Sequence, residues 1–273
     1  LRRKPLIYDS HEYFTEAAGL TGRAFQRGVW LAVEKWLFPR LNAVITVNDA
    51  IADAYLERYP NGAAGRPLVV RNMPLSQKRE ERDDAIWADY NIPCIRPIFI
   101  LQGAFLDKDR GVREAVEALD SIAKGTLVVV GAGVEFEWAL EQVDSAKGRL
   151  FCLPKLPFES LRKLTASADV GLSLDRGVHG NYWMSLPNKL FDYIHAGVPV
   201  VVSPMPEVAR IVERWQIGAV IADHQPESIA EAIERVLQVP NSEWRTRCEL
   251  AALHLHWGAE EQNIQQALEQ AGV

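Results

Sequence analysis

The chain has 273 residues, 48% of them hydrophobic, and carries a formal net charge of −6. This length and composition predict one or two globular domains with sizeable cores, and the acidic balance argues against a nucleic-acid binder, which would present a basic surface. We expect no membrane span and no secretory signal peptide, because no apolar run approaches the roughly 18 residues of a spanning helix and none follows the basic start.

Residues 1–75 are predicted to form part of a Rossmann-like lobe. The runs PLIYDSHE, NAVITVND and RPLVVRNMP have the character of strands, and helical periodicity over 24–40 and 49–59 predicts helices between them. This stretch is shorter than the roughly 100 to 200 residues of an ordinary domain, so we expect the closing part of an N-terminal lobe that lacks its beginning. Residues 1–80 carry a formal charge of +4, which is compatible with an anionic acceptor, a membrane surface or ordinary solvated surface.

The first predicted helix is rich in aromatic side chains. Core packing is their expected role, since an apolar helix face is usually covered by neighbouring elements. Contact with a lipid-linked acceptor is the alternative. The residues concerned are Phe25, Trp30, Trp36, Leu37 and Phe38.

Residues 76–95 are charged, contain Pro93 and end in a short helical pattern, as expected of a linker. From residue 96 onward, six short apolar runs each precede an amphipathic stretch of helical period. This alternation predicts an α/β domain over 96–242, with a doubly wound parallel sheet covered on both faces. Residues 243–273 have helical patterns and are expected to pack across both lobes.

Ligands bind at the carboxyl ends of the strands in an open parallel sheet. This rule selects Gly103 and Arg110 after the first run of the domain, the glycines of 131–136 after the second, and the loop 175–184 after the fourth. The GAGVEF segment does not complete a dinucleotide fingerprint, because Phe136 stands at the third glycine position. A tight turn is therefore its simpler interpretation.

The segment SLPNKLFDYIHAGVPVVVS predicts a helix over 186–196 that leads into a buried strand. Its apolar positions form one stripe at helical spacing: Leu186, Leu190, Tyr193, Ile194 and Gly197. Asn188, Lys189 and Asp192 then face the strand-end crevice, where a helix N-terminus offers free amides to an anion. A cation and a carboxylate there suit the phosphate and the ribose diol of a nucleotide. A surface ion pair between Lys189 and Asp192 is the alternative.

Neither a metal site nor a disulfide is predicted. The DKD segment at 107–109 lies in a polar loop, and His224, His254 and His256 lack a convincing set of further ligands. Three widely spaced cysteines favour reduced thiols and a cytoplasmic location.

Several of these segments resemble family 4 glycosyltransferases of the two-lobed GT-B fold. SLPNKLFDYIHAGVPVV is similar to their donor-binding segment, in which an acidic residue precedes an A-G-x-P-V-V run. LQGAFLDKDRGVREAVEAL is similar to the first βα unit of their C-terminal lobe. YDSHEYF, AVITVNDAIADAYLERY and VVRNMP are similar to the end of their N-terminal lobe. The resemblance runs in order from residue 5 to about 240 and implies a complete C-terminal lobe in an N-terminally truncated member.

The resemblance also implies roles for individual residues. Asp192 matches the acidic residue that binds the donor's ribose hydroxyls. Arg110 matches the basic residue that contacts the donor diphosphate, with Lys189 placed to help. Gly103 matches the glycine that lets the donor approach the backbone. His11 matches the N-lobe histidine that faces the transferred sugar, with its neighbour in sequence, a glutamate, beside it.

Sugar transfer places demands on the site that point to the same residues. Breaking a sugar–phosphate bond develops negative charge on the departing diphosphate, and fixed positive groups lower that barrier. Arg110, Lys189 and the amides near Pro187 and Asn188 are the candidates.

Two positions depart from the family pattern. The glutamate expected to contact the donor sugar is replaced by Met184, and the second basic residue of the phosphate pair falls at Ala104. Asn181 and His179, in the preceding loop, are candidates to replace the lost hydrogen bonds.

The expected function is transfer of a sugar from a nucleotide diphosphate sugar to an oligosaccharide or lipid-linked acceptor, with retention of configuration and without a metal or other cofactor. Expected partners are the donor, the acceptor and, if the protein is peripheral to the inner face of a membrane, the lipid surface. A non-catalytic nucleotide-sugar-binding lobe or partner subunit is the alternative, and a sugar-nucleotide epimerase is the third hypothesis.

Overall fold

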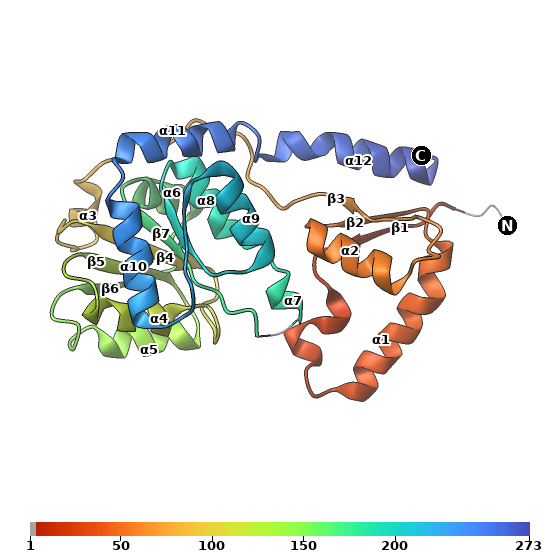
Figure 1. Ribbon diagram of the computed structural model, residues 1–273, viewed down its shortest axis with the longest axis horizontal. Helices are drawn as coiled ribbons and strands as arrows, with labels where there is room; N and C mark the ends of the chain where they lie inside the picture. Colours follow the sequence, from red (N-terminus) through yellow and green to blue (C-terminus); the bar gives the residue numbers. More distant parts are fainter. Residues whose placement is uncertain (1–3, 179) are drawn as a thin grey trace.

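The computed structural model describes residues 4–178 and 180–273 and contains two α/β lobes that lie side by side (Figure 1). Each lobe is built on its own parallel sheet. The chain passes from the N-terminal lobe to the C-terminal lobe once, and its last helix returns to the N-terminal lobe. In the described part of the chain, no helix is both long enough and apolar enough to cross a membrane.

The strands of the N-terminal lobe are parallel and pair in chain order: β1 (Ile7–Ser10), β2 (Ala43–Thr46) and β3 (Leu68–Val69). Its helices are α1 (Ala24–Leu37) and α2 (Asp49–Arg58), with the 3₁₀ helices η1 (Phe14–Glu16), η2 (Ala18–Leu20) and η3 (Phe38–Arg40). Helix α2 begins after Asn48, because the side chain of Asn48 accepts a hydrogen bond from the amide of Ile51 at 2.9 Å and so caps the first turn.

Helix α1 leaves most of its aromatic side chains exposed. Phe25 is 81% exposed, Trp36 61% and Trp30 44%, so the prediction that they pack in the core is wrong for these three. Leu37 and Phe38, by contrast, lie in or against the core of the lobe. Helical periodicity reveals an apolar face, but it does not reveal which part of that face a neighbouring element covers.

The strands of the C-terminal lobe are β4 (Ile98–Gly103), β5 (Thr126–Gly131), β6 (Leu150–Pro154), β7 (Val170–Ser173), β8 (Val200–Val202) and β9 (Gly218–Val220). They are parallel and lie in the order β6-β5-β4-β7-β8-β9. The chain therefore winds outward from β4 in both directions, which confirms the predicted doubly wound sheet.

Helices cover both faces of this sheet: α4 (Val112–Glu117), continued by η4 (Ala118–Asp120), α5 (Val134–Gln142), α6 (Phe158–Ala166), α8 (Asn188–Ala196), α9 (Pro206–Trp215) and α10 (Pro226–Leu237). The short helices α3 (Ile86–Asp89) and α7 (Gly180–Trp183) lie in the connections. Along β4, Ile98 and Ile100 pack under α6, α8 and α9, whereas Phe99 and Leu101 pack under α4, α5 and α10. Burial on both faces explains the unbroken apolar runs.

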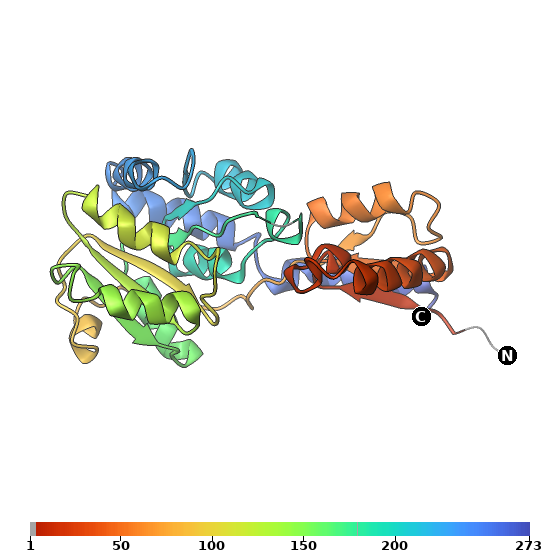
Figure 2. The ribbon, with the colours of Figure 1, turned by 90° about the horizontal axis from the view of Figure 1, so that it is seen from below.

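The last two helices join the lobes. Helix α11 (Asn241–Ala252) packs on α8 and α9, and α12 (Trp257–Ala271) packs on β2 and β3 of the N-terminal lobe (Figures 1 and 2). The side chain of Asn263 donates a hydrogen bond to the carbonyl of Val69 at 2.9 Å, which ties α12 to the end of β3.

A second bridge between the lobes forms around α7. The amide of Tyr13 donates to Oδ1 of Asn181 at 2.8 Å, and Nδ2 of Asn181 donates to Glu12 at 3.1 Å. The side chain of Asn48 donates to the carbonyl of Met184 at 2.6 Å. These contacts hold the loop after β1 and the start of α2 against the segment that leads into α8.

Candidate functional site

A cavity of about 590 Å³ lies at the carboxyl ends of β4, β5 and β6, beside the first turn of α8. Six of the residues expected to bind the donor line it: Gly103, Arg110, Pro187, Asn188, Lys189 and Asp192. Gly103 ends β4 and Arg110 lies in the loop after it, whereas Pro187 caps α8 and the other three lie in its first five residues. The residues selected by the strand-end rule and by the helix pattern therefore line one cavity.

Helix α8 presents its polar residues to the cavity because its opposite face is fixed against the sheet. It begins at Asn188 rather than at Leu186 as predicted, and Pro187 occupies the N-cap position. The rest of the predicted apolar stripe is buried: Leu190, Tyr193, Ile194 and Gly197. A Cβ at position 171 of β7 would lie 2.5 Å from the Tyr193 ring, so Gly171 allows the helix to approach the strand closely.

Two of the cations that line the cavity, Lys189 and Arg110, share one buried carboxylate. Lys189 Nζ lies 2.7 Å from Oδ2 of Asp175, and Arg110 Nη1 lies 3.1 Å from Oδ1 of the same side chain. Burial alone would raise the pKa of Asp175, but Lys189 and Arg110 together hold it below its usual value. Two positive charges on one negative charge leave the cluster with a net positive charge. The expected alternative, a pair between Lys189 and Asp192, is not the arrangement found.

Two glycines shape the loop that carries Arg110. Gly111 adopts a positive φ of 76°, and a Cβ there would lie 2.4 Å from Leu174, so a larger residue would displace the loop. A Cβ at Gly103 would lie 2.7 Å from the side chain of Leu106. The glycine at 103 is therefore needed for the packing of the loop as well as lining the cavity.

The N-terminus of α8 has no capping side chain. Proline has no N–H, so Pro187 lines the cavity without offering an amide, and the amide donors of the first turn begin with Asn188 and Lys189. Such uncapped amides, next to the Lys189 ammonium group, form a favourable environment for an anion.

Asp192 is held by a side chain from β4. Gln102 Nε2 donates to Asp192 Oδ2 at 3.2 Å. Burial raises the pKa of Asp192 to about 6, and the hydrogen bond from Gln102 opposes that rise. The group is therefore a hydrogen-bond acceptor of full charge only near neutral pH and above.

His11 is the predicted site residue that the structure does not bring to this cavity. Its side chain is 74% exposed and lies 3.3 Å from the carboxylate of Asp9. It is not among the lining residues. The neighbouring Glu12 contacts Asn181 across the interface between the lobes.

The positions that depart from the family pattern have clear local environments. Met184 packs against the core of the N-terminal lobe, so an apolar contact between the lobes occupies the position expected to touch the donor sugar. Ala104 lies on the rim of the cavity, next to Phe105, whose ring centroid is 3.5 Å from Lys155 Nζ. Both ends of the Asn181 amide contact the N-terminal lobe, so the expectation that it replaces a donor contact is wrong. His179, the other candidate for that role, lies outside the described residues.

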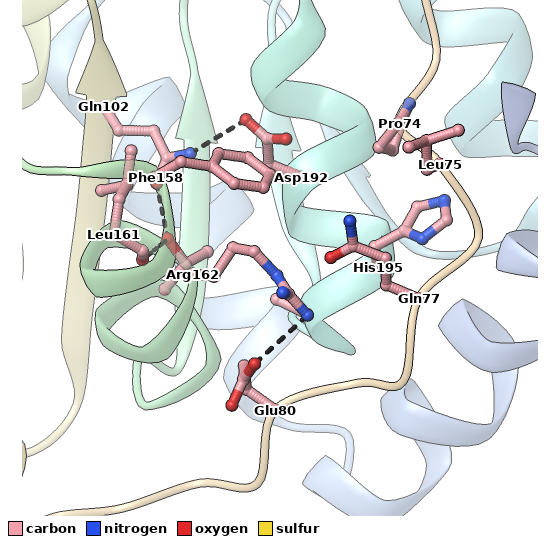
Figure 3. Close-up of a pocket in the computed structure, with 12 residues that line it drawn as sticks. Pro74, Leu75, Gln77, Glu80, Gln102, Phe158, Leu161, Arg162, Asp192 and His195 are labelled. Carbon is pink, nitrogen blue, oxygen red and sulfur yellow. Dashed lines mark hydrogen bonds and ion pairs between the residues drawn. The ribbon is translucent and has the colours of Figure 1, made fainter.

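A smaller cavity adjoins the first and shares Gln102, Leu161 and Asp192 with it. Figure 3 shows this cavity between α6, α8 and the segment that follows β3. Arg162 of α6 forms an ion pair with Glu80 of that segment at 3.2 Å. Apolar atoms of Phe158 and Leu161 contribute to its lining. Asp192 therefore stands at the junction of two cavities.

Two residues with specific contacts in the cavity were not identified from the sequence. Asp175 is the first residue of the loop that the strand-end rule selected, so the signal was present but did not distinguish it from its neighbours. Gln102 is a polar residue within an apolar strand run, and a buried polar side chain normally has a hydrogen-bond partner. That signal would have been sufficient to select Gln102.

Metal ligands are not clustered in the residues that the structure describes: no group of three or more His, Cys, Asp or Glu side chains lies close enough to hold an ion.

Comparison with known proteins places residues 96–239 within a family described as glycosyl transferases group 1. The chain is 24% identical to glycogen synthase of Mycobacterium tuberculosis over 253 residues. The alignment covers 86% of this chain and 55% of that protein. The chain therefore spans about half the length of this curated relative.

Solved structures share the fold. Sucrose-phosphate synthase from Thermosynechococcus elongatus aligns with a TM-score of 0.72 and 20% identity, over 97% of this chain and 67% of that one. HepE of Anabaena, crystallised in complex with UDP, aligns with a TM-score of 0.76 and 15% identity, over 97% of this chain and 72% of that one. The predicted two-lobed GT-B architecture is confirmed.

Proposed function

The chain belongs to the glycosyl transferases group 1 family, and we propose that it binds a nucleotide diphosphate sugar beside α8 and transfers the sugar to a carbohydrate or lipid-linked acceptor. The observation that carries this proposal is the cavity in which Asp192, Arg110 and Lys189 converge. A nucleotide sugar has a diol, two phosphates and a sugar in a fixed order, and these side chains suit the first two parts.

The donor would lie along the cavity in a defined direction. The ribose hydroxyls bind the Asp192 carboxylate, and the diphosphate reaches Arg110, Lys189 and the first amides of α8. The base then extends from Asp192 into the smaller cavity, where Phe158 and Leu161 offer apolar contacts. HepE has been crystallised with UDP and with UDP-glucose, which makes uridine nucleotides the first to test.

The chemistry follows from the charges in the cavity. As the bond between the sugar and the diphosphate breaks, negative charge develops on the leaving phosphate, and preorganised cations stabilise that charge more than they stabilise the bound donor. Arg110 and Lys189 are already fixed by Asp175 before the donor binds. We propose that these covalently attached cations do this without a metal ion, and that the reaction retains the configuration at the anomeric carbon.

The acceptor would approach from the side of the N-terminal lobe. Exposed Phe25, Trp30 and Trp36 on α1, together with the positive charge of residues 1–80, support an acceptor with apolar and anionic parts, such as a lipid-linked sugar phosphate. The same features support contact with an anionic membrane surface, and we propose that the protein is cytoplasmic and meets the inner face of that membrane.

A non-catalytic nucleotide-sugar-binding lobe is the second candidate. It is favoured by the exposed position of His11 away from the cavity and by Met184, which packs between the lobes in place of a donor-contacting glutamate. This candidate keeps the proposed binding mode and removes the transfer step.

The test is a thermal-shift screen with UDP, GDP and ADP and with their glucose conjugates, followed by turnover measurements on the donor that stabilises the chain. A ligand at 100 times its dissociation constant stabilises the folded state by about 2.7 kcal/mol. Release of nucleoside diphosphate that depends on an added sugar acceptor supports transfer. Binding without turnover favours the second candidate, conversion of the sugar without an acceptor identifies an epimerase, and no stabilisation by any nucleotide contradicts the proposal.

A further inference from the structure

Gln102 lies where the sheet meets two helices of the proposed donor site. Side chains alternate along β4, so Gln102 continues the row of Ile98 and Ile100 toward α6 and α8. It is 2% exposed. A buried polar side chain at the end of an apolar row needs partners, and one partner comes from each helix.

The partner on α6 is Thr165, which is also buried. Its hydroxyl lies 2.7 Å from Oε1 of Gln102 and 2.7 Å from the carbonyl of Leu161. A hydroxyl has one proton. When that proton is donated to Gln102, the carbonyl end of the amide is fixed toward α6, and its NH₂ end must point the other way.

The partner on α8 is Asp192. Gln102 Nε2 donates to Asp192 Oδ2 at 3.2 Å, and Figure 3 shows the two side chains facing each other at the edge of the smaller cavity. Among the residues that the structure describes, no other side chain is hydrogen-bonded to this carboxylate. Oδ2 is therefore engaged, and Oδ1 is left for a ligand.

The backbone of Gln102 adds a second connection to α8. Its amide lies 3.3 Å from the hydroxyl of Tyr193, which is also 3.2 Å from the carbonyl of Ile100. The residue next to Asp192 is thus held to the same strand, so rotation of the helix is restricted as well as rotation of the carboxylate.

We propose that Gln102, with its amide oriented by Thr165, is the positioning residue that aims Asp192 at the ribose hydroxyls of the donor. This inference rests on the proposed function. It assigns Gln102 no direct role in the transfer step and makes a prediction about one part of the ligand only. Loss of the Gln102 side chain weakens binding of the ribose diol by Asp192 and leaves binding of the diphosphate unchanged.

The experiment compares calorimetric affinities for UDP and for 2′,3′-dideoxy-UDP, with GDP and its dideoxy form as a second pair. Gln102→Met keeps the length of the side chain and removes its hydrogen bonds. We expect it to weaken binding of the ribonucleotide about tenfold, the loss of one hydrogen bond to a charged group, and to change binding of the dideoxynucleotide less than twofold. If Gln102 contacted the base or merely supported the fold, its substitution would lower the affinity for the ribonucleotide and the dideoxynucleotide equally. That result overturns the inference.

A pair of variants at Thr165 provides an independent readout. Thr165→Val removes the hydroxyl at nearly constant volume, and Thr165→Ser retains it. We expect Thr165→Val to reproduce the selective loss of ribonucleotide affinity and Thr165→Ser to behave as the unmodified chain. Equal behaviour of the two variants contradicts the inference. Failure of the unmodified chain to bind any nucleotide of the thermal-shift screen contradicts the proposed function itself, and this inference with it.

Discussion

Lys189 Nζ lies 2.7 Å from Oδ2 of Asp175, and both side chains are almost completely buried. Arg110 reaches the other oxygen of the same carboxylate, so the two cations of the proposed phosphate site are held together before any ligand arrives. The site is therefore preorganised, and Asp175 neutralises part of its positive charge.

This arrangement predicts that Asp175→Asn lowers the melting temperature of the free chain, because buried Lys189 and partly buried Arg110 lose their common anion. A bound diphosphate replaces the missing negative charge. We therefore expect the rise in melting temperature caused by the stabilising nucleoside diphosphate to be larger in Asp175→Asn than in the unmodified chain, as measured by calorimetric melting.

Asp169 provides a matched control for that comparison. It lies at the opposite end of β7, is buried, and pairs with Arg82 and Arg96 at 2.9 and 2.6 Å. Asp169→Asn is expected to destabilise the chain without changing the shift that the nucleotide produces. If both variants show the same ligand-induced shift as the unmodified chain, Asp175 has no special relation to the phosphate site.

The raised pKa of Asp192 predicts a pH dependence of donor affinity. Because burial raises this pKa to about 6, the carboxyl is protonated below that pH and loses its charge as a hydrogen-bond acceptor. Affinity for UDP-glucose, whose phosphates do not titrate in this range, should rise between about pH 5 and pH 7 and then level off. Asp192→Asn, which keeps the other titratable groups of the two cavities, should remove this rise; a rise that persists in the variant assigns the titration to another group.

Because one face of α1 is exposed, we expect substitutions of the aromatic residues between 25 and 38 to change the free energy of unfolding by unequal amounts. Phe38→Ala removes a buried ring that stacks on Tyr59 and should lower the free energy of unfolding by about 3 to 5 kcal/mol. Phe25→Ala alters a ring that is 81% exposed and should change it by less than about 0.5 kcal/mol. Chemical denaturation followed by tryptophan fluorescence measures both; a cost at Phe25 comparable to that at Phe38 would mean that α1 is covered in solution.

Much of the fold follows from local patterns. The apolar run of β4 is visible in the sequence because both faces of the sheet are buried, which makes successive residues apolar. The stripe of α8 is visible because only one face of the helix is buried, which spaces its apolar residues at the helical period. The handedness of βα connections limits the possible strand orders, but the return from β6 to the far side of β4, where β7 lies, is not encoded in these local patterns.

The details of the site depend on contacts that local patterns do not encode. Lys189 was expected to face the crevice, but its pairing with Asp175 arises from the meeting of a loop after β7 with the first turn of α8. The exposure of Trp36 depends on which elements cover α1. The position of His11 depends on how the loop after β1 meets α7, where Asn181 holds the residues that follow His11.

The central claim is that one nucleotide is bound by Asp192 through its ribose and by Arg110 through its phosphates. Isothermal titration calorimetry tests it most directly, with the unmodified chain, Asp192→Ala and Arg110→Ala each titrated with the nucleoside diphosphate that stabilises the unmodified chain. Arg113→Ala serves as the control, because Arg113 pairs with Glu135 and does not line the cavity. The account predicts that each of the first two substitutions weakens binding by about 1 to 3 kcal/mol, the loss of a hydrogen bond to a charged group, and that the control does not. Unchanged affinity in both Asp192→Ala and Arg110→Ala would contradict it.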